Sequence, residues 1–440
     1  MPSYFTFTGN PFVDAGIFVL SELLNKNIEE ITPQDLKEPI NTILSLYLSD
    51  TWRKNLYSIF PNNPITNPSI KNKKEYFLKK MGILLDSFVP LKNTGSCIAC
   101  GRREIDQPKT KDEIPLTGSG DLVNFFPAGQ AGENYCSVCT FAVQFMPLFL
   151  YNLGGKFLLL HSPSLKVMKV WARQGIKNAR EQLLSGVFTG CFDDGYRRGD
   201  NALFHIIEDV VLSYEEKWME ENSSASAYIF TNYGQNPALE IIYLPADVFK
   251  FLVYVKAHEA CSEWKKVVKK GYDNFKSEEE FKRRQNKVYR NLLEGQSIIS
   301  YFLDKDRTIV GSWEILTFYL TEVRKMENKR IETIKKVSDK MAKIIRLKDN
   351  TKRLFSIERA NSYDSLRGVF LNLVKDNITL GSSEPLLTLD ELTQDLFPEG
   401  AYGWKEIRDI ILFRLYEVLH DYLIAKKELP ELEEIEEEEE

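Results

Sequence analysis

Two short cysteine motifs decide how this chain folds: Cys97-Ile98-Ala99-Cys100 and, after 35 intervening residues, Cys136-Ser137-Val138-Cys139. The spacing within each motif lets both sulfurs turn toward one metal ion at about 2.3 Å. Four thiolates complete the tetrahedral coordination that zinc accepts and leave no position for water or substrate. The sequence therefore predicts a structural zinc site with the ligands Cys97, Cys100, Cys136 and Cys139. The alternative is two unrelated pairs of buried cysteines.

The composition indicates a globular protein from a reducing compartment. Of the 440 residues, 43% are hydrophobic and 27% are charged, which is ordinary for two or three domains with real cores. The other two cysteines, Cys191 and Cys261, have no partner nearby in sequence, so no disulfide framework is expected. Residues 1–10 lack the pattern of a signal peptide. The apolar run 138–160 is interrupted by polar residues, proline and glycines, so we expect a buried helix and a strand in a cytoplasmic protein.

The net charge of −6 comes from one end of the chain. Residues 428–440 hold nine glutamates and no basic residue, whereas the rest of the chain has 57 basic against 54 acidic residues. Such an acidic segment is disordered by composition. The remaining body is mildly basic, which is compatible with a nucleic-acid partner but does not require one.

The N-terminal stretch Thr8-Gly9-Asn10-Pro11-Phe12-Val13-Asp14-Ala15-Gly16 has the pattern of a helix start. Asn10 suits the N-cap, and Pro11 suits the first helical position because its missing N–H needs no partner there. A capped helix is the simpler interpretation. The alternative is that the Gly9-Asn10 turn presents backbone donors to a phosphate or a base edge.

The periodicity predicts an α+β fold that is mainly α. We expect helices at 33–60, 72–90, 164–184, 199–219 and 404–427, strands at 156–161, 225–231 and 239–244, and an almost wholly helical chain after about residue 245. We divide the chain into a mixed N-terminal domain (1–305), into which the zinc-pinned loop 93–140 is inserted, a C-terminal helical bundle (306–427) and the acidic tail (428–440).

Three stretches favour contact with phosphates. The turn Asp193–Asp200 presents Arg197 and Arg198, although a solvated loop is the simpler interpretation. Residues 265–290 carry ten Lys or Arg against four acids, and residues 324–353 carry twelve against four. Basic helix faces of this kind can follow a sugar–phosphate backbone.

Motifs for catalysis are missing from the sequence. The four histidines have no metal-ligand spacing, and no P-loop, Gly-x-Ser-x-Gly or two-metal carboxylate cluster is present. We expect a protein that is not an enzyme. Two alternatives stay open at this point: a free-standing zinc-ribbon nucleic-acid-binding protein, and a nuclease or other cleft enzyme.

The Thr8–Gly16 stretch together with the two cysteine motifs resembles the CXXC–CXXC family of CRISPR-associated proteins, the large subunit of type I-B Cascade complexes. The resemblance covers roughly residues 4–160. It implies a non-catalytic subunit that recognises the short motif beside the target (the PAM), aids R-loop formation, holds the displaced DNA strand and recruits the effector helicase-nuclease. It further implies crRNA, the Cascade backbone subunits and double-stranded target DNA as partners.

Under this resemblance, the nucleic-acid contacts fall on the Gly9-Asn10 turn, the zinc-pinned loop and the basic segments. The loop residues Phe125, Phe126 and Gln130 are candidate wedges between base pairs. The full set of expected contact residues is Gly9, Asn10, Arg102, Arg103, Phe125, Phe126, Gln130, Arg197, Arg198, Lys335, Lys336, Lys340 and Lys343.

Overall fold

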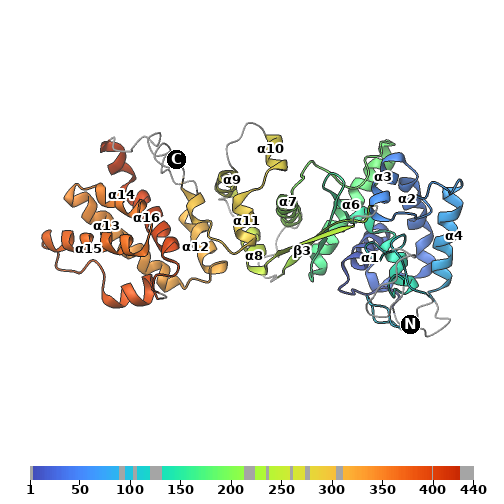
Figure 1. Ribbon diagram of the computed structural model, residues 1–440, viewed down its shortest axis with the longest axis horizontal. Helices are drawn as coiled ribbons and strands as arrows, with labels where there is room; N and C mark the ends of the chain where they lie inside the picture. The colour runs from blue at the N-terminus through green and yellow to red at the C-terminus, as the bar shows by residue number, and fades with distance from the viewer. Residues whose placement is uncertain are drawn as a thin grey trace. The chain divides into compact units, whose positions relative to one another are not determined.

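The computed structural model divides into two compact units, which are described separately (Figure 1). The N-terminal unit comprises residues 1–249 and 275–285, and the C-terminal unit comprises residues 250–274 and 286–440. The residues that the structure describes are 3–88, 95–102, 107–118, 131–212, 223–233, 237–257, 261–272, 278–303, 311–398 and 400–426.

The N-terminal unit is built around the helix α1 (Pro11–Leu24). The Asn10 side chain caps this helix, and Asn25 ends it in the left-handed conformation at φ 49°. Every residue from Val13 to Ser21 is buried, so α1 is a central helix and not a surface one. The helices that follow before the cysteine motifs are η1 (Ile28–Glu30), η2 (Pro33–Leu36), α2 (Lys37–Tyr47), α3 (Asp50–Ile59) and α4 (Lys73–Asp86).

A four-stranded antiparallel sheet lies beside α1, in the order β1-β2-β3-β4. In β2, residues 157–160 are all buried, which explains why this strand reads as a continuous apolar run. Phe12 of α1 packs edge-on against Phe230 of β3 with ring centroids 5.2 Å apart. The strands are β1 (Tyr151–Asn152), β2 (Phe157–His161), β3 (Ala225–Thr231) and β4 (Ala238–Leu244).

Glycine allows α1 to approach the chain after the second cysteine motif. A Cβ atom on Gly16 would lie 1.9 Å from the carbonyl oxygen of Ala142, which belongs to α5 (Ser137–Val143). No side chain fits into that space, so residue 16 is glycine because two backbones meet there. The remaining helices of the unit are η3 (Met146–Phe149), α6 (Leu165–Ser185), α7 (Gly199–Leu212) and α10 (Glu278–Arg283).

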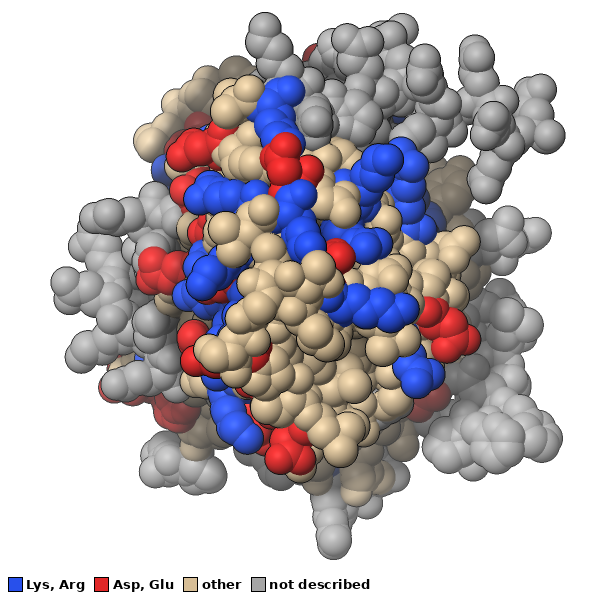
Figure 2. Space-filling model, turned by 90° about the vertical axis from the view of Figure 1, so that its left-hand side faces the viewer, with Lys and Arg blue, Asp and Glu red and all other residues tan. Residues whose placement is uncertain are grey.

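Among its described residues, the C-terminal unit consists of helices joined by turns and loops. Its longest pair, α13 and α16, pack against each other, and α13 buries Ile331, Ile334, Met341 and Ile345 at helical spacing. Figure 2 shows Lys and Arg side chains gathered on the face formed at this end of the chain. The helices are α8 (Ala246–Ala257, which begins in the N-terminal unit), α9 (Cys261–Lys270), α11 (Lys287–Leu293), η5 (Ile299–Phe302), α12 (Trp313–Glu322), α13 (Asn328–Lys348), α14 (Lys352–Glu358), α15 (Tyr363–Thr379), η6 (Glu391–Leu396) and α16 (Trp404–Lys426).

The structure confirms the predicted α+β, mainly α class, and strands β2, β3 and β4 occupy the predicted positions. The apolar run 138–160 contains the expected buried helix, α5, and the expected strand, β2. Pro147 follows the seven-residue α5, which gives way to the short η3 and to β1. Among the described residues, no helix has the length and apolar character needed to cross a membrane.

The predicted boundaries at residues 305 and 427 stay predictions, because compact units do not test which parts fold independently. The structure joins residues 250–274 and 286–305 to the C-terminal unit. The acidic tail, residues 428–440, lies outside the described residues, as do residues 213–219 of the expected 199–219 helix.

Candidate metal centre and nucleic-acid interface

The four cysteines of the two motifs converge on one point. Their sulfur atoms all lie within 4.8 Å of one another, and the Sγ atoms of Cys100 and Cys136 are 3.6 Å apart. A disulfide needs about 2.05 Å, whereas the sulfurs of a tetrahedral Zn–S site with bonds of about 2.3 Å stand about 3.8 Å apart. All four are free thiols. The donor set therefore fits one thiophilic metal ion.

Backbone hydrogen bonds shape the first motif and join it to the second. The N–H of Cys97 donates to the carbonyl of Arg102 (2.7 Å), and Gly101 turns the chain at φ 72°. The N–H of Ile98 donates to the carbonyl of Asn134 (2.8 Å), which places the two motifs side by side. Cys136 caps the N-terminus of α5, where its sulfur accepts from the N–H of Cys139 at 3.5 Å.

The pKa values of these thiols are shifted in different directions. Hydrogen bonding from Cys100 and then from the second motif lowers the pKa of Cys97, whereas hydrogen bonding to Cys100 raises the pKa of Cys136. A dication at the centre favours the thiolate form of all four ligands. Three of the four are buried, and Cys100 is partly exposed. With four sulfur ligands the centre is closed, so it can hold structure but offers no open position for a reacting group.

The Thr8–Gly16 stretch is organised by one buried carboxylate. The side chain of Asp14 has no exposed surface and accepts hydrogen bonds from the N–H and hydroxyl of Thr8 (both 2.8 Å) and from the N–H of Gly9 (2.9 Å). Its other neighbour is Nε2 of His161, on β2, at 3.0 Å. These contacts fix the turn that precedes α1, in which Gly9 adopts φ 80°.

Asn10 links this turn to the cysteine centre. Its side-chain oxygen accepts from the N–H of Val13 (3.2 Å), and its side-chain nitrogen donates to the hydroxyl of Tyr135 (3.1 Å), the residue before Cys136. Burial raises the pKa of Tyr135 to about 12. Arg102 adds a second link, because its guanidinium donates to the carbonyls of Ser3 (2.9 Å) and Tyr4. The N-terminal residues, the first motif and the second motif thus form one local structure.

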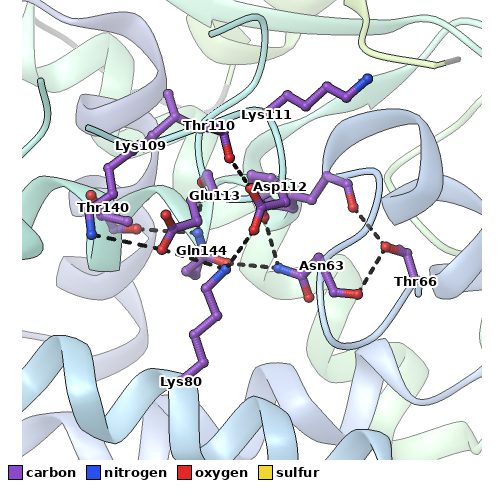
Figure 3. A network of polar contacts seen from close by, with 12 residues as sticks. Asn63, Thr66, Lys80, Lys109, Thr110, Lys111, Asp112, Glu113, Thr140 and Gln144 are labelled. Carbon is purple, nitrogen blue, oxygen red and sulfur yellow. Dashed lines mark hydrogen bonds and ion pairs between the residues drawn. The ribbon is translucent and has the colours of Figure 1, made fainter. Parts of the chain in front are cut away.

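The loop between the motifs, residues 101–135, is held at a second place (Figure 3). Lys80 reaches from α4 to the carboxylates of Asp112 (3.4 Å) and Glu113 (3.6 Å). The side-chain nitrogen of Gln144 donates to the carbonyl of Glu113 (2.9 Å), and that of Asn63 donates to the carbonyl of Asp112 (3.3 Å). Buried amides of this kind are costly unless paired, so they specify the position of residues 112–113 closely.

A small ladder closes the base of the same loop. Lys109 and Glu133 exchange two backbone hydrogen bonds of 2.7 and 2.9 Å, and Lys111 donates to the carbonyl of Gly118 (2.8 Å). The described parts of the loop are therefore anchored to α4, α5 and each other and do not depend on the cysteines alone. We call residues 107–118 the anchored segment.

Some of the predicted nucleic-acid contact residues lie within the described part of the chain, and others do not. Gly9, Asn10 and Arg102 lie together beside the cysteine centre, through the contacts given above. Arg103, Phe125, Phe126 and Gln130 lie outside the described residues. Their contact with nucleic acid stays a prediction.

The Asp193–Asp200 turn carries its arginines in ion pairs. Arg197 forms a two-pronged pair with the carboxylate of Asp193 (2.8 and 3.2 Å), and Arg198 lies 3.6 Å from Asp200. A cavity of about 370 Å³ adjoins the turn and is lined by Asp194, Gly195, Arg197, Glu279, Lys282 and Arg283.

Behind that turn, Asp194 bonds the imidazole of His205 and the hydroxyl of Tyr151. Burial works to lower the pKa of His205, but the carboxylates of Asp194, Asp209 and Glu208 together raise it overall. Burial works to raise the pKa of Asp194, but His205, Tyr151 and Lys282 together lower it overall. The pair stabilises the turn and leaves Arg197 on the cavity side.

The four predicted lysines of α13 lie together. Lys335, Lys336, Lys340 and Lys343 line a groove of about 370 Å³ with Glu332 and Asp339, and we call it the lysine groove. It lies on the helix face opposite the buried residues. The sequence spacing of three and four residues was sufficient to place these side chains on one face.

The sequence did not point to several residues that shape the site. Tyr135, Lys80, Asn63 and Gln144 are far apart in the chain from their partners, and nothing in their local sequence signals a tertiary contact. The pair of Asp14 and His161 was equally hidden, since 147 positions separate them. The only available signal for Asp14 was its place within the Thr8–Gly16 stretch.

Comparison with known proteins bears on this centre. Residues 91–151 match the family model described as CRISPR-associated protein (Cas_CXXC_CXXC). The matched segment contains both cysteine motifs, the loop between them and α5. The match supports a CRISPR-associated protein of the CXXC type and does not reach the rest of the chain. No curated protein and no solved structure matches the chain.

Proposed function

We propose that this protein is the non-catalytic large subunit of a type I-B CRISPR Cascade complex. In this role it recognises the PAM, aids R-loop formation, holds the displaced DNA strand and recruits the effector helicase-nuclease. The observation that carries the proposal is the convergence of four cysteines inside the segment that matches a CRISPR-associated family. The Thr8–Gly16 stretch, packed against that segment through Asn10 and Gly16, supports it further.

The metal of the proposal is zinc, held by Cys97, Cys100, Cys136 and Cys139. When bound, it supplies cross-linking of the two motifs and no reaction chemistry, because four thiolates close its coordination sphere. The chain's own residues extend this cross-link: Tyr135 joins it to Asn10 at 3.1 Å. A rigid base of this kind suits a loop that must hold its position while DNA strands separate.

The DNA side of the proposal has two parts. The wedge candidates Phe125, Phe126 and Gln130 belong to segment 119–130, and the described chain on both sides of that segment is anchored by the backbone contacts of Lys111 with Gly118 and of Lys109 with Glu133. The lysine groove offers ammonium groups in a row, which suits the backbone of a displaced single strand and carries no sequence preference. PAM recognition therefore belongs to the N-terminal unit and strand retention to the C-terminal unit.

The proposal is tested by expressing the tagged chain in cells with a type I-B CRISPR array and the Cascade backbone genes. We expect the purified protein to carry crRNA, the backbone subunits and one zinc per chain. A matched variant, Cys97→Ser with Cys136→Ser, should lose the zinc. Purification of the wild-type chain alone, with zinc and with DNA binding that ignores the PAM, would instead support a free-standing zinc-ribbon protein.

The non-catalytic assignment is tested by a DNA-cleavage assay on the isolated protein. We expect the isolated chain to leave single- and double-stranded DNA intact in the presence of Mg²⁺ or Mn²⁺, since cleavage belongs to the recruited nuclease. Metal-dependent cleavage that a single acidic substitution abolishes would overturn the non-catalytic assignment.

A further inference from the structure

The lysine groove is the face of a strongly basic helix. α13 carries eight Lys or Arg against two acidic residues, Glu332 and Asp339, and both of these acids line the groove. Asp339 is paired with Arg414 of α16, whose guanidinium lies 2.7 and 3.2 Å from its carboxylate and also contacts Glu417. The lysines therefore dominate the charge that the groove presents.

The lysines of the groove form only long or exposed contacts with other described residues. Lys336 lies 3.6 Å from Glu391, and Lys335 stands over the ring of Trp313 at 5.4 Å. Lys340 lies 3.7 Å from the exposed Glu384 and donates an exposed hydrogen bond of 3.1 Å to the carbonyl of Pro385. Exposed ion pairs of such length stabilise by less than about 1 kcal/mol and exchange readily for another anion. Among the described residues, Lys343 has no carboxylate partner. The groove can accept a run of negative charge without breaking a strong contact.

The chain leaves α16 close to this groove. Helices α13 and α16 run in the same direction, because Arg414 pairs with Asp339 and, two turns later, Tyr422 donates to Asp349 at 2.5 Å. Lys426, the last residue of α16, pairs with the same Asp349 at the end of α13. The last described residue of α16 therefore lies beside the end of α13.

We propose that the acidic segment 427–440 docks in the lysine groove and competes there with nucleic acid. Nine glutamates in that segment match the positive charge of the groove. The most distant lysine of the groove, Lys335, lies about 21 Å from Asp349 along the helix axis. Fourteen extended residues span up to about 46 Å, so the segment reaches the whole groove with room to turn.

Attachment to α16 makes the docking effective although each contact is weak. A short tether gives an effective concentration in the millimolar range, so modest charge attraction fills the groove in the absence of a competitor. A nucleic-acid strand brings a denser and longer row of charges and displaces the segment. The competition with nucleic acid rests on the function proposed above, whereas the docking itself does not. The segment would then suppress binding to unrelated strands while allowing retention of a strand delivered by R-loop formation.

The docking is tested first without nucleic acid, by the rate at which an amine-acetylating reagent modifies individual lysines. Three proteins are compared at low salt: the full chain, a chain ending at residue 426, and a full-length chain with the nine glutamates changed to glutamine. We expect Lys336, Lys340 and Lys343 to react about threefold faster in both altered proteins, the change for a groove that is two-thirds occupied. Lys54 of α3 should react equally in all three.

A second measurement reads the competition, as the affinity for a fluorescent single-stranded oligonucleotide. Loss of the acidic segment should raise affinity about threefold in the wild-type groove. It should have no effect in the variant Lys336→Gln, Lys340→Gln, Lys343→Gln. Equal lysine reactivity in the three proteins would overturn the docking, and so would an equal gain of affinity in the groove variant. Faster acetylation without any oligonucleotide binding would support the docking and count against the proposed function.

Discussion

Replacing Gly16 by alanine tests the central packing of the N-terminal unit. The added Cβ would lie 1.9 Å from the carbonyl oxygen of Ala142 and 2.5 Å from its carbonyl carbon, so α1 must move away from α5 by more than 1 Å. Neither atom belongs to a flexible side chain that can turn aside. Overpacking of this kind costs about 3 kcal/mol, and the better helix propensity of alanine returns about 1 kcal/mol. We expect a net destabilisation of about 2 kcal/mol.

Hydrogen exchange measured by mass spectrometry reports this loss locally, which is needed in a chain with two units. A loss of about 2 kcal/mol should speed exchange about 30-fold in the peptides of α1 and α5. The matched control is Gly82→Ala in α4, where the added Cβ has no neighbour within 4 Å. That variant should be slightly stabilised, by about 0.5–1 kcal/mol. Equal exchange in both variants would refute the packing argument.

Three further predictions concern the metal centre, the N-terminal turn and the buried histidine. The double variant Cys97→Ser, Cys136→Ser should release zinc, whose binding contributes about 10–16 kcal/mol in small sites. The anchored segment should keep its protection from hydrogen exchange in this variant. Zinc retained by the variant would contradict the proposed metal centre. Asn10→Ala should lower discrimination between duplexes with and without the PAM, since a base contact is worth roughly 1–3 kcal/mol. The control Ser312→Ala, which removes the N-cap of α12, should leave this discrimination unchanged. An equal loss of affinity for both duplexes in Asn10→Ala would indicate capping alone. His205→Gln should lower the free energy of unfolding by about 1–2 kcal/mol below pH 6.5. This loss should become smaller as the pH rises through the raised pKa of His205. A loss of stability in thermal unfolding that does not depend on pH would contradict a charged pair of His205 and Asp194.

Local patterns in the sequence were sufficient to predict much of the secondary structure and the cysteine cluster. The N-cap Asn10, the alternation in β3 and the spacing of apolar residues in α13 each involve neighbours within a few positions. Such signals reflect backbone and burial preferences that a short stretch expresses on its own. The cysteine motifs belong to the same class, because metal coordination dictates their spacing.

Contacts between distant parts of the chain could not be predicted in this way. The anchoring of residues 112–113 depends on Asn63, Lys80 and Gln144, which reach them from three separate parts of the chain. Each of these residues is an ordinary polar side chain in its own sequence context. The sequence therefore indicated a loop held at its two ends by the cysteine motifs, whereas the structure also anchors its described residues 109–113.

The burial of α1 has a consequence for how the protein is made. Its apolar face packs on α5, α6 and β2, and the carboxylate of Asp14 pairs with His161, 147 residues further on. At roughly 5–20 residues per second, a ribosome needs about 7–30 s to deliver these partners. During that interval α1 can pack only against earlier elements such as η1 and α2, which cover little of it. Synthesis of this chain thus has an early period in which the apolar surface of α1 stays exposed, and that period ends only when α5, β2 and α6 have emerged.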